Sequence, residues 1–332
     1  MPTDLSKATV VITGASSGIG RATALELASY GSSVVLAGRR SGALEALAQD
    51  CERRGGRAIA VPTDTADEEA VDFLARRAEE EFGGFDVWVN NASVYAVGRA
   101  DEVPSEAIRR LIDVNLLGYV WGSRAALRHF RQRGRGVLIQ NASVLGKGGA
   151  PYLSYYAATK HAVIGYAQSL RMELLGEKDI HVCTVMPATM DTPIFQQAAN
   201  FSGRALKALN PVYEAGDAAR AIVACARKPE AEVFAGNAAK AVAALRQAST
   251  TAYEQTFAMQ VEADHFGDAE APRTMGNLLE PMREYAAISG GWTVGRGQVS
   301  DQRVTRVALV GAMLLALGAG GLAWRRGRTA GS

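Results

Sequence analysis

The sequence predicts an α/β protein built on a doubly wound parallel sheet, with helices on both faces and a C-terminal helical extension. Short β-branched runs alternate with longer stretches of helical period from Ala8 onward, which is typical of repeated strand-helix-strand units. Runs such as 87–89 and 137–139 are hydrophobic almost without a break, which indicates strands covered on both faces. A glycine-rich turn joins the first strand to the first helix.

The order of these elements follows from the pattern. Six strands are expected at 9–13, 33–37, 57–62, 87–90, 136–141 and 181–186, and 232–235 is a candidate for a seventh. The first helix is expected at 19–30 and ends before Gly31, a residue suited to a left-handed C-cap. Residues 237–261 predict one or two amphipathic helices, and 266–297 predict a loop-rich linker.

Composition excludes several classes of protein. The formal net charge of +2 is small and no stretch interleaves basic with aromatic residues, so we expect no nucleic-acid partner. Cys51, Cys183 and Cys225 are scattered, which favours neither a disulfide framework nor a zinc site. The N-terminal residues lack the pattern of a secretory signal, so no secretion is expected.

The glycine-rich turn predicts a phosphate-binding site. Glycines between a strand and a helix let backbone amides approach a pyrophosphate, and the helix N-terminus adds partial positive charge. The alternative is an ordinary loop of small residues. The residues expected to contact the phosphates are Gly14, Ser16, Ser17, Gly18, Ile19 and Gly20.

The end of the second strand indicates which coenzyme binds. A carboxylate there usually holds a ribose 2′-hydroxyl, but this strand ends in Gly38, Arg39 and Arg40. Gly38 leaves room for a 2′-phosphate and Arg39 offers a guanidinium fork that matches phosphate geometry. NADP is therefore expected rather than NAD, and the alternative is a solvated arginine pair.

Four polar residues predict acid-base chemistry. Tyr156 and Lys160 are four residues apart, which on a helix places both on one face, where the ammonium can lower the pKa of the phenol. Ser143 follows a strand and could orient a substrate carbonyl. Asn115 lies on an expected helix and could hold a relay water. Separately, Ser143 could be a turn cap and Asn115 an ordinary amide.

These motifs resemble the short-chain dehydrogenase/reductase family over residues 9–235, which implies a Rossmann-like fold. The family's Thr-Gly-x-x-x-Gly-x-Gly matches 13–20, and its Asn-Asn-Ala-Gly matches 90–93. Its Ser, Tyr and Lys match Ser143, Tyr156 and Lys160, and its helix asparagine matches Asn115. Ser93 and Ala188 depart from the pattern, since each stands where the family usually has glycine.

The resemblance implies further site residues and a reaction. Hydride would pass between the nicotinamide and a carbonyl or alcohol carbon while Tyr156 moves the proton, Ser143 steadies the oxygen, and Lys160 binds the nicotinamide ribose and tunes Tyr156. Homo-oligomers are common in the family. The remaining residues implied to contact the coenzyme are Asp64, Thr65, Asn90, Ala92, Pro187 and Thr192.

Residues 189–210 take the place of the family's substrate lid. They include Met190, Ile194, Phe195, Phe201, Leu206 and Leu209, and an apolar lid predicts a small lipophilic carbonyl or alcohol substrate. Ordinary core packing of the same side chains is the alternative.

Residues 307–324 carry no charged side chain and are flanked by arginines, which predicts a membrane anchor of about 27 Å. A buried core helix is the alternative. We expect a catalytic dinucleotide-binding domain at 1–236, an extension at 237–302 and an anchor helix at 303–328, with the catalytic domain facing the cytoplasm. Whether the helix spans the membrane or lies on it is left open.

The expected function is NADP-dependent oxidoreduction of a lipophilic carbonyl or alcohol. A membrane-bound NADP-binding sensor or scaffold is the main alternative, because the same residues would bind coenzyme without turnover. A sugar-nucleotide epimerase or dehydratase is a third reading, but those relatives favour Gly-x-x-Gly-x-x-Gly, and here the glycines are Gly14, Gly18 and Gly20.

Overall fold

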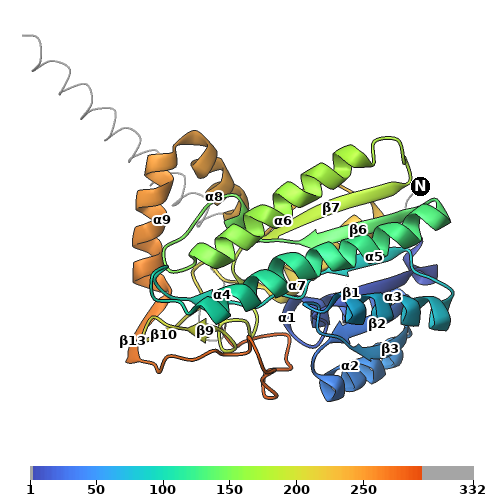
Figure 1. The fold of residues 1–332 in the computed structure, drawn as a ribbon, viewed down its shortest axis with the longest axis horizontal. Coiled ribbons are helices and arrows are strands. Elements are labelled where there is room, and N and C mark those ends of the chain that lie inside the picture. Colours follow the sequence, from blue (N-terminus) through green and yellow to red (C-terminus); the bar gives the residue numbers. More distant parts are fainter. Residues whose placement is uncertain (1–2, 294–332) are drawn as a thin grey trace, which may run out of the picture.

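The computed structural model describes residues 3–293, and its centre is a parallel seven-stranded sheet in the order β12-β7-β6-β4-β1-β2-β3 (Figure 1). The predicted doubly wound sheet is confirmed, and so is the candidate seventh strand at its edge. The strands are β1 (Thr9–Thr13), β2 (Ser33–Gly38), β3 (Arg57–Pro62), β4 (Val87–Asn90), β6 (Gly136–Asn141), β7 (Ile180–Pro187) and β12 (Glu232–Ala235).

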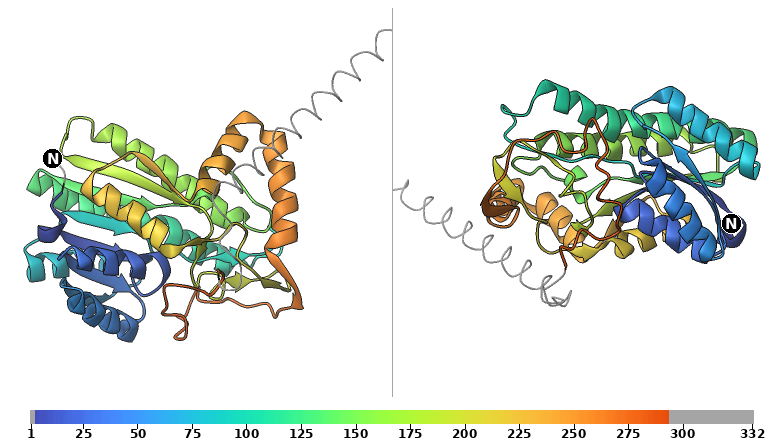
Figure 2. Two further views of the ribbon diagram at one scale, coloured as in Figure 1. Left: turned by 180° about the vertical axis from the view of Figure 1, so that it is seen from behind. Right: turned by 90° about the horizontal axis from the view of Figure 1, so that it is seen from below.

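Helices cover both faces of this sheet, as the unbroken hydrophobic strands predict. Val10 packs toward α1, α2 and α7, whereas its neighbour Val11 packs toward α3, α5 and α6, because successive side chains of a strand point to opposite faces. Figures 1 and 2 show these two helical layers. The helices are α1 (Gly18–Ser29), α2 (Ser41–Arg53), α3 (Glu68–Phe82), α4 (Ser105–Ile112), α5 (Gly118–Arg133), α6 (Ser154–Glu173) and α7 (Ala215–Arg227). Gly31 has φ +86° after the first helix, as its predicted capping role requires.

The C-terminal extension packs on the sheet domain. Both expected helices form, as α8 (Asn237–Ala248) and α9 (Thr250–Asp264), and Tyr253, Phe257 and Val261 of α9 share a buried cluster with Tyr156. The sequence predicts a loop from 266 onward, and this is wrong at its start. Strand β13 (Phe266–Glu270) pairs antiparallel with β10 (Arg204–Leu206), and the pairing satisfies backbone groups of both segments.

Short two-residue pairs hold the predicted lid in place. They join the loop after β4 and the segment before α7 to residues 190–200, so the lid is held near its start and at its middle. The pairs are β5 (Ala96–Val97) with β9 (Ala199–Asn200), and β8 (Met190–Asp191) with β11 (Tyr213–Glu214).

Within residues 3–293, no helix has the length and apolar character needed to cross a bilayer. The apolar segment 307–324, for which the sequence predicts a membrane anchor, lies outside the described residues.

A buried polar network joins β4 to its neighbours and sets the spacing of α5. The Asn90 amide accepts a hydrogen bond from Trp88 Nε1 at 2.8 Å and donates to Gln140 Oε1 at 3.0 Å. Gly122 of α5 lies against this network, and a Cβ at that position would lie 2.1 Å from Asn90 Oδ1. Only glycine therefore lets α5 approach β4 this closely.

We predict that Gly122→Ala lowers the free energy of unfolding by about 2 to 3 kcal/mol, because the added methyl group overpacks the site and disturbs buried hydrogen bonds. Gly165→Ala is the matched control, since a Cβ there meets nothing within 4 Å on the exposed face of α6. That control should stabilise the protein by about 0.5 to 1 kcal/mol. Urea unfolding measures both, and equal effects would contradict the close-approach account.

Candidate active site

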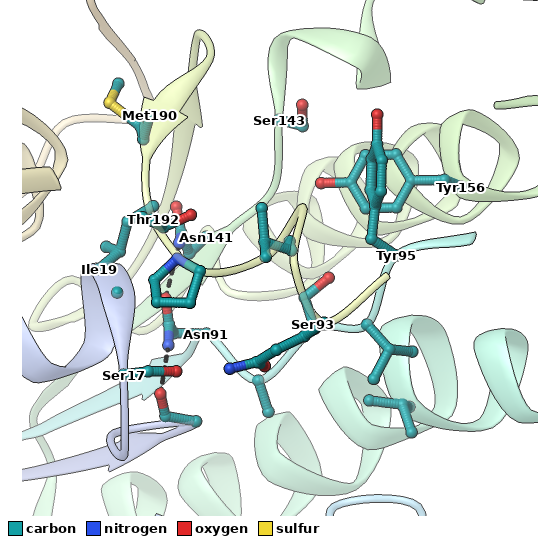
Figure 3. A pocket seen from close by; sticks show the side chains of 18 of the residues that line it. Ser17, Ile19, Asn91, Ser93, Tyr95, Asn141, Ser143, Tyr156, Met190 and Thr192 are labelled. Atoms are coloured by element: carbon teal, nitrogen blue, oxygen red, sulfur yellow. Dashed lines mark hydrogen bonds between the residues drawn. The ribbon is translucent and has the colours of Figure 1, made fainter. Parts of the chain in front are cut away.

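A cleft opens at the carboxyl ends of the sheet strands, where parallel α/β sheets bind ligands (Figure 3). It runs from the glycine turn after β1, past the ends of β2, β4, β6 and β7, to α9 in the extension. Most of the predicted site residues line it: Gly14, Ser16, Ser17, Gly18, Ile19, Arg39, Arg40, Asp64, Thr65, Ala92, Ser143, Tyr156, Lys160, Pro187 and Thr192.

Gly20 and Asn90 lie beside the cleft instead of on its wall, which corrects their predicted place. The Asn90 side chain is committed to the buried network under β4, and the neighbouring Asn91 lines the cleft. Gly20 serves packing, because a Cβ there would lie 2.4 Å from the Gly14 carbonyl oxygen.

The turn after β1 has the shape that a pyrophosphate needs. Gly14 and Gly18 have φ +66° and +54°, and a Cβ on Gly14 would lie 2.7 Å from Ala92 Cα. Thr13 Oγ1 accepts hydrogen bonds from the Asn91 and Ala92 amides at 2.9 and 3.1 Å, which fixes the turn against the end of β4. The residues present therefore fit a dinucleotide at this position.

Residues 271–293, which we name the C-terminal strap, cross the adenosine end of the cleft. Arg39 donates to the carbonyl oxygens of Asn277, Leu278 and Leu279 in the strap. Arg40 donates to the Met282 and Tyr285 carbonyl oxygens at 3.0 and 2.7 Å, and also to Ser16 Oγ. Asn277, Pro281 and Met282 line the cleft, so the strap forms one of its walls.

The strap is fastened at its far end by Asp191 of β8. Its carboxylate accepts hydrogen bonds from the Gly290 and Trp292 amides at 2.9 and 3.0 Å, and from the Ser289 and Thr293 hydroxyls. Burial opposes ionisation of Asp191, but these hydrogen bonds together lower its pKa. Gly18 N also donates to the Ala287 carbonyl at 3.0 Å, so the strap contacts the phosphate turn itself.

Asp64, which the resemblance places near the adenine, lines the cleft after β3. Its carboxylate pairs with Arg110 of α4, and Arg110 Nε donates to the Leu278 carbonyl at 2.8 Å. The charge of Asp64 is therefore balanced by Arg110. Arg39, Arg40 and Arg110 all donate to strap carbonyls at this end of the cleft.

Tyr156, Ser143 and Lys160 meet at the other end of the cleft. Tyr156 and Lys160 lie on α6 and are 8% and 1% exposed. Ser143, which follows β6, accepts a hydrogen bond from the Leu145 amide at 3.1 Å, so its own proton is free to point into the cleft. Figure 3 shows the Tyr156 hydroxyl directed into the cleft below Ser143. The structure thus brings these three predicted residues together in one cleft.

The sequence predicts that Lys160 makes Tyr156 more acidic, and the structure corrects this. Burial raises the pKa of Tyr156 to about 12 and lowers that of Lys160 to about 7. Lys160 Nζ donates to Tyr119 Oη and the Asn141 carbonyl, each at 3.3 Å, and lies 5.6 Å from the centroid of the Tyr156 ring. The groups that lower the pKa of Tyr156 are instead the hydroxyls of Ser143 and Ser93.

Asn115 lies in a π-helical turn between α4 and α5, rather than in a regular helix. It is fully buried, and its Oδ1 accepts hydrogen bonds from Val94 N at 2.8 Å and Ser93 Oγ at 3.1 Å. Its Nδ2 donates to the Val94 carbonyl at 2.9 Å. Asn115 thus holds the loop after β4, and the relay water expected beside it stays a prediction.

The substrate end of the cleft is mainly apolar. Of the predicted lid residues, Ile194, Phe195 and Leu209 line the cleft beside this end and Met190 lines it nearer the glycine turn, whereas Phe201 and Leu206 pack away from the cleft. Sequence reasoning missed a polar pair within this wall, in which Tyr95 Oη lies 3.2 Å from His265 Nε2. Burial lowers the pKa of His265 to about 4. Its position at the end of α9 carried no motif that could have marked it.

The fold and this cleft define a nicotinamide-dependent oxidoreductase of the α/β class. Residues 8–202 match the family model described as short chain dehydrogenase, and the chain belongs to that family. The chain is 39% identical over 239 residues to an uncharacterized oxidoreductase, YxnA, of Bacillus subtilis, covering 71% of this chain and 67% of that protein. It is also 39% identical to 3beta-hydroxysteroid dehydrogenase 1 of Eggerthella lenta, over 58% of this chain and 74% of that one.

Solved structures agree with the fold and the type of coenzyme. A short chain dehydrogenase/reductase from Burkholderia phymatum in complex with NAD superposes with a TM-score of 0.67 at 26% identity, covering 76% of this chain and 97% of that one. An alcohol dehydrogenase from Thermococcus sibiricus complexed with 5-hydroxy-NADP gives 0.61 at 26% identity, covering 68% and 95%. The chain is therefore an NAD(P)-dependent dehydrogenase or reductase that acts on alcohol or ketone groups.

Proposed function

We propose that the chain uses NADP to interconvert a carbonyl and an alcohol on a small lipophilic molecule. The observation that carries this proposal is the buried Tyr156 hydroxyl, which faces the cleft beside Ser143 where an apolar wall begins. Coenzyme and substrate would meet there. The coenzyme, when bound, supplies or accepts the hydride at its nicotinamide ring.

In the reducing direction, the side chains handle the proton and the developing charge. The hydride adds to the carbonyl carbon, the electrons of the C=O double bond move to oxygen, and that oxygen takes the proton of Tyr156. Ser143 donates a hydrogen bond to the same oxygen, since its lone pair is already held by the Leu145 amide. The tyrosinate then regains a proton from solvent. Lys160 would bind the nicotinamide ribose.

The apolar wall supports a lipophilic substrate. Phe195, Leu209 and Phe257 line this part of the cleft together with Leu153, so a hydrocarbon body would bury its surface against them. The Tyr95–His265 pair offers hydrogen bonds in the same wall. The Eggerthella relative is described as acting on a hydroxysteroid, which is a molecule of this kind.

We predict that Tyr156→Phe keeps coenzyme binding but loses at least about a thousandfold in kcat, because it removes the proton and leaves the ring in place. Reduction of apolar ketones such as acetophenone and 2-decanone, followed by NADPH absorbance, measures it. Tyr155→Phe is the control, since that neighbour donates its hydroxyl to the Ala100 carbonyl at the surface. Undiminished turnover by Tyr156→Phe would contradict the proposal. A wild-type protein that binds NADPH without turning over any of these ketones would favour the alternative of an NADP-binding sensor.

NADP is proposed over NAD because β2 is followed by two arginines, Arg39 and Arg40, and not by a carboxylate. Arg39 and Arg40 are half-buried at the adenosine end, held in direction by the strap carbonyls, and Ser16 Oγ lies beside Arg40. A 2′-phosphate placed here would accept hydrogen bonds from the same two arginines as the strap carbonyls. Because the phosphate is charged, its hydrogen bonds to the guanidinium groups would be stronger than those of the neutral carbonyl oxygens. The solved neighbours include both an NAD complex and one with an NADP analogue.

We predict that Arg39→Ala weakens NADPH binding about ten- to a hundredfold and leaves NADH binding nearly unchanged, because a charge-assisted hydrogen bond to phosphate is lost. Fluorescence titration with each coenzyme measures this. Arg53→Ala is the control, since that residue is exposed and pairs with Asp50 on α2. Equal losses for NADPH and NADH would mean that Arg39 serves the strap alone.

From the sequence, we further propose that residues 307–324 anchor the chain to a membrane. Its catalytic domain would lie in the cytoplasm, where NADP is supplied. We also propose that copies of the chain form an oligomer.

We predict that the full chain sediments with membranes and that a Leu314→Arg, Leu315→Arg double variant does not, since each arginine costs about 2.5 to 3.5 kcal/mol at the centre of a span. Ultracentrifugation of cell fractions measures this. Equal sedimentation would remove the anchor.

A further inference from the structure

Ser93 stands at the catalytic end of the cleft, in the loop after β4, where the family resemblance expects glycine. A glycine would leave that part of the wall as bare backbone. Here a hydroxyl projects into the space between the loop and α6, and Figure 3 shows it on the side of Tyr156 opposite Ser143. The departure from the pattern therefore adds a polar group next to the reacting phenol.

One side of this hydroxyl is fixed by Asn115. Ser93 Oγ donates to Asn115 Oδ1 at 3.1 Å, and Asn115 is buried and held to both polar groups of the Val94 backbone. Because Oδ1 also accepts from the Val94 amide, it keeps a partner if Ser93 turns away. The serine hydroxyl can thus change its acceptor without leaving a buried oxygen unpaired.

The other side of the hydroxyl faces Tyr156. Ser93 and Ser143 lie on opposite sides of the Tyr156 hydroxyl in the wall of the cleft (Figure 3), and both lower its pKa, against the larger effect of burial, which raises it. The other titratable groups around this phenol are Lys160 on its own helix, Tyr119 of α5, and Tyr95, whose ring centroid lies 4.8 Å away. His265 stands behind Tyr95. Burial disfavours the charged form of each of these groups.

We propose that Ser93 is a catalytic hydrogen-bond donor to the Tyr156 oxygen, with Asn115 as the positioning residue that holds it there. The proposal rests on the proposed role of Tyr156. While the phenol is neutral, Ser93 donates to Asn115 and can accept from Tyr156. Once the Tyr156 O–H bond has given its proton to the substrate oxygen, the Ser93 hydroxyl turns and donates to the phenolate. No covalent bond of Ser93 itself breaks.

A hydrogen bond from Ser93 would offset the energetic cost of burying the Tyr156 phenolate. A phenolate enclosed by apolar side chains is costly unless hydrogen bonds replace the water that it has lost. Ser143 is engaged with the substrate oxygen during the same step, so it cannot serve the phenolate fully. Ser93 would donate from the side of Tyr156 opposite Ser143. A purely structural Ser93 would hold Asn115 and leave the titration of Tyr156 unchanged.

The decisive variants are Ser93→Ala and Ser93→Gly, which remove the hydroxyl, and Ser93→Thr, which keeps it. Oxidation of 1-phenylethanol with NADP⁺ requires the phenolate, so its rate rises with pH through the pKa of Tyr156. Loss of the donor should move that rise about one pH unit upward, which is about a tenfold slower rate below it. The threonine variant should follow the wild type. A uniform drop in rate without a pH shift, or no change, overturns the proposal.

A second readout does not depend on turnover. Tyrosine labelled with ¹³C at Cζ reports ionisation by NMR, and the Tyr156 signal is the one that Tyr156→Phe removes. In the protein without coenzyme, its alkaline onset should come at higher pH in Ser93→Ala and Ser93→Gly than in the wild type. An unchanged onset overturns the role of Ser93. An altered onset in a protein whose Tyr156→Phe variant stays active would uphold the contact and refute the proposed function instead.

Effects of the Ser93 variants on folding can be separated from their effects on the ionisation of Tyr156. Ser93→Gly restores the residue that the family pattern has at this position, so the backbone accepts it. Urea unfolding of each variant shows whether Asn115 has lost its anchor. A large loss of stability shared by the alanine, glycine and threonine variants, with Tyr156 titrating as in the wild type, would assign Ser93 to structure alone.

Discussion

The burial of Lys160 and Tyr156 is the constraint on which the rest of the site depends. Both sit on α6 under the carboxyl ends of β6 and β7, with almost no exposure to water. Desolvation pushes the pKa of the phenol up and that of the amine down, so burial disfavours both the phenolate and the ammonium. The Tyr119 hydroxyl and the Asn141 carbonyl accept hydrogen bonds from Lys160, and the hydroxyls of Ser143 and Ser93 lower the pKa of Tyr156.

The C-terminal strap extends this enclosure to the coenzyme end. Its carbonyl oxygens satisfy Arg39 and Arg40, and Asp191 fastens its far end through four hydrogen bonds. Phe257 of α9 and His265, which follows that helix, belong to the substrate wall. The extension therefore completes both ends of a cleft whose centre belongs to the family fold.

The sheet and the core of the site were predictable from local signals. Hydrophobic runs located every strand of the seven-stranded sheet, and the motifs around Gly14 and Tyr156 located the two ends of the cleft, because each carries its chemistry within a few residues of chain. The rest depends on tertiary packing. Nothing near Asp191 or His265 in the sequence shows that the chain returns over the cleft, and the pKa of Tyr156 is set by burial, which periodicity does not measure. Asn90 was assigned to the cleft because a motif fixes sequence spacing and not side-chain direction.

The most direct measurement of the central constraint is the pKa of Lys160 itself. Lysine labelled with ¹³C at Cε titrates by NMR, and the Lys160 signal is the one that Lys160→Arg removes. Burial predicts a midpoint near 7 for this amine in the protein without coenzyme. A midpoint near the ordinary lysine value of about 10.4 would show a solvated ammonium and contradict the account of a desolvated catalytic pair.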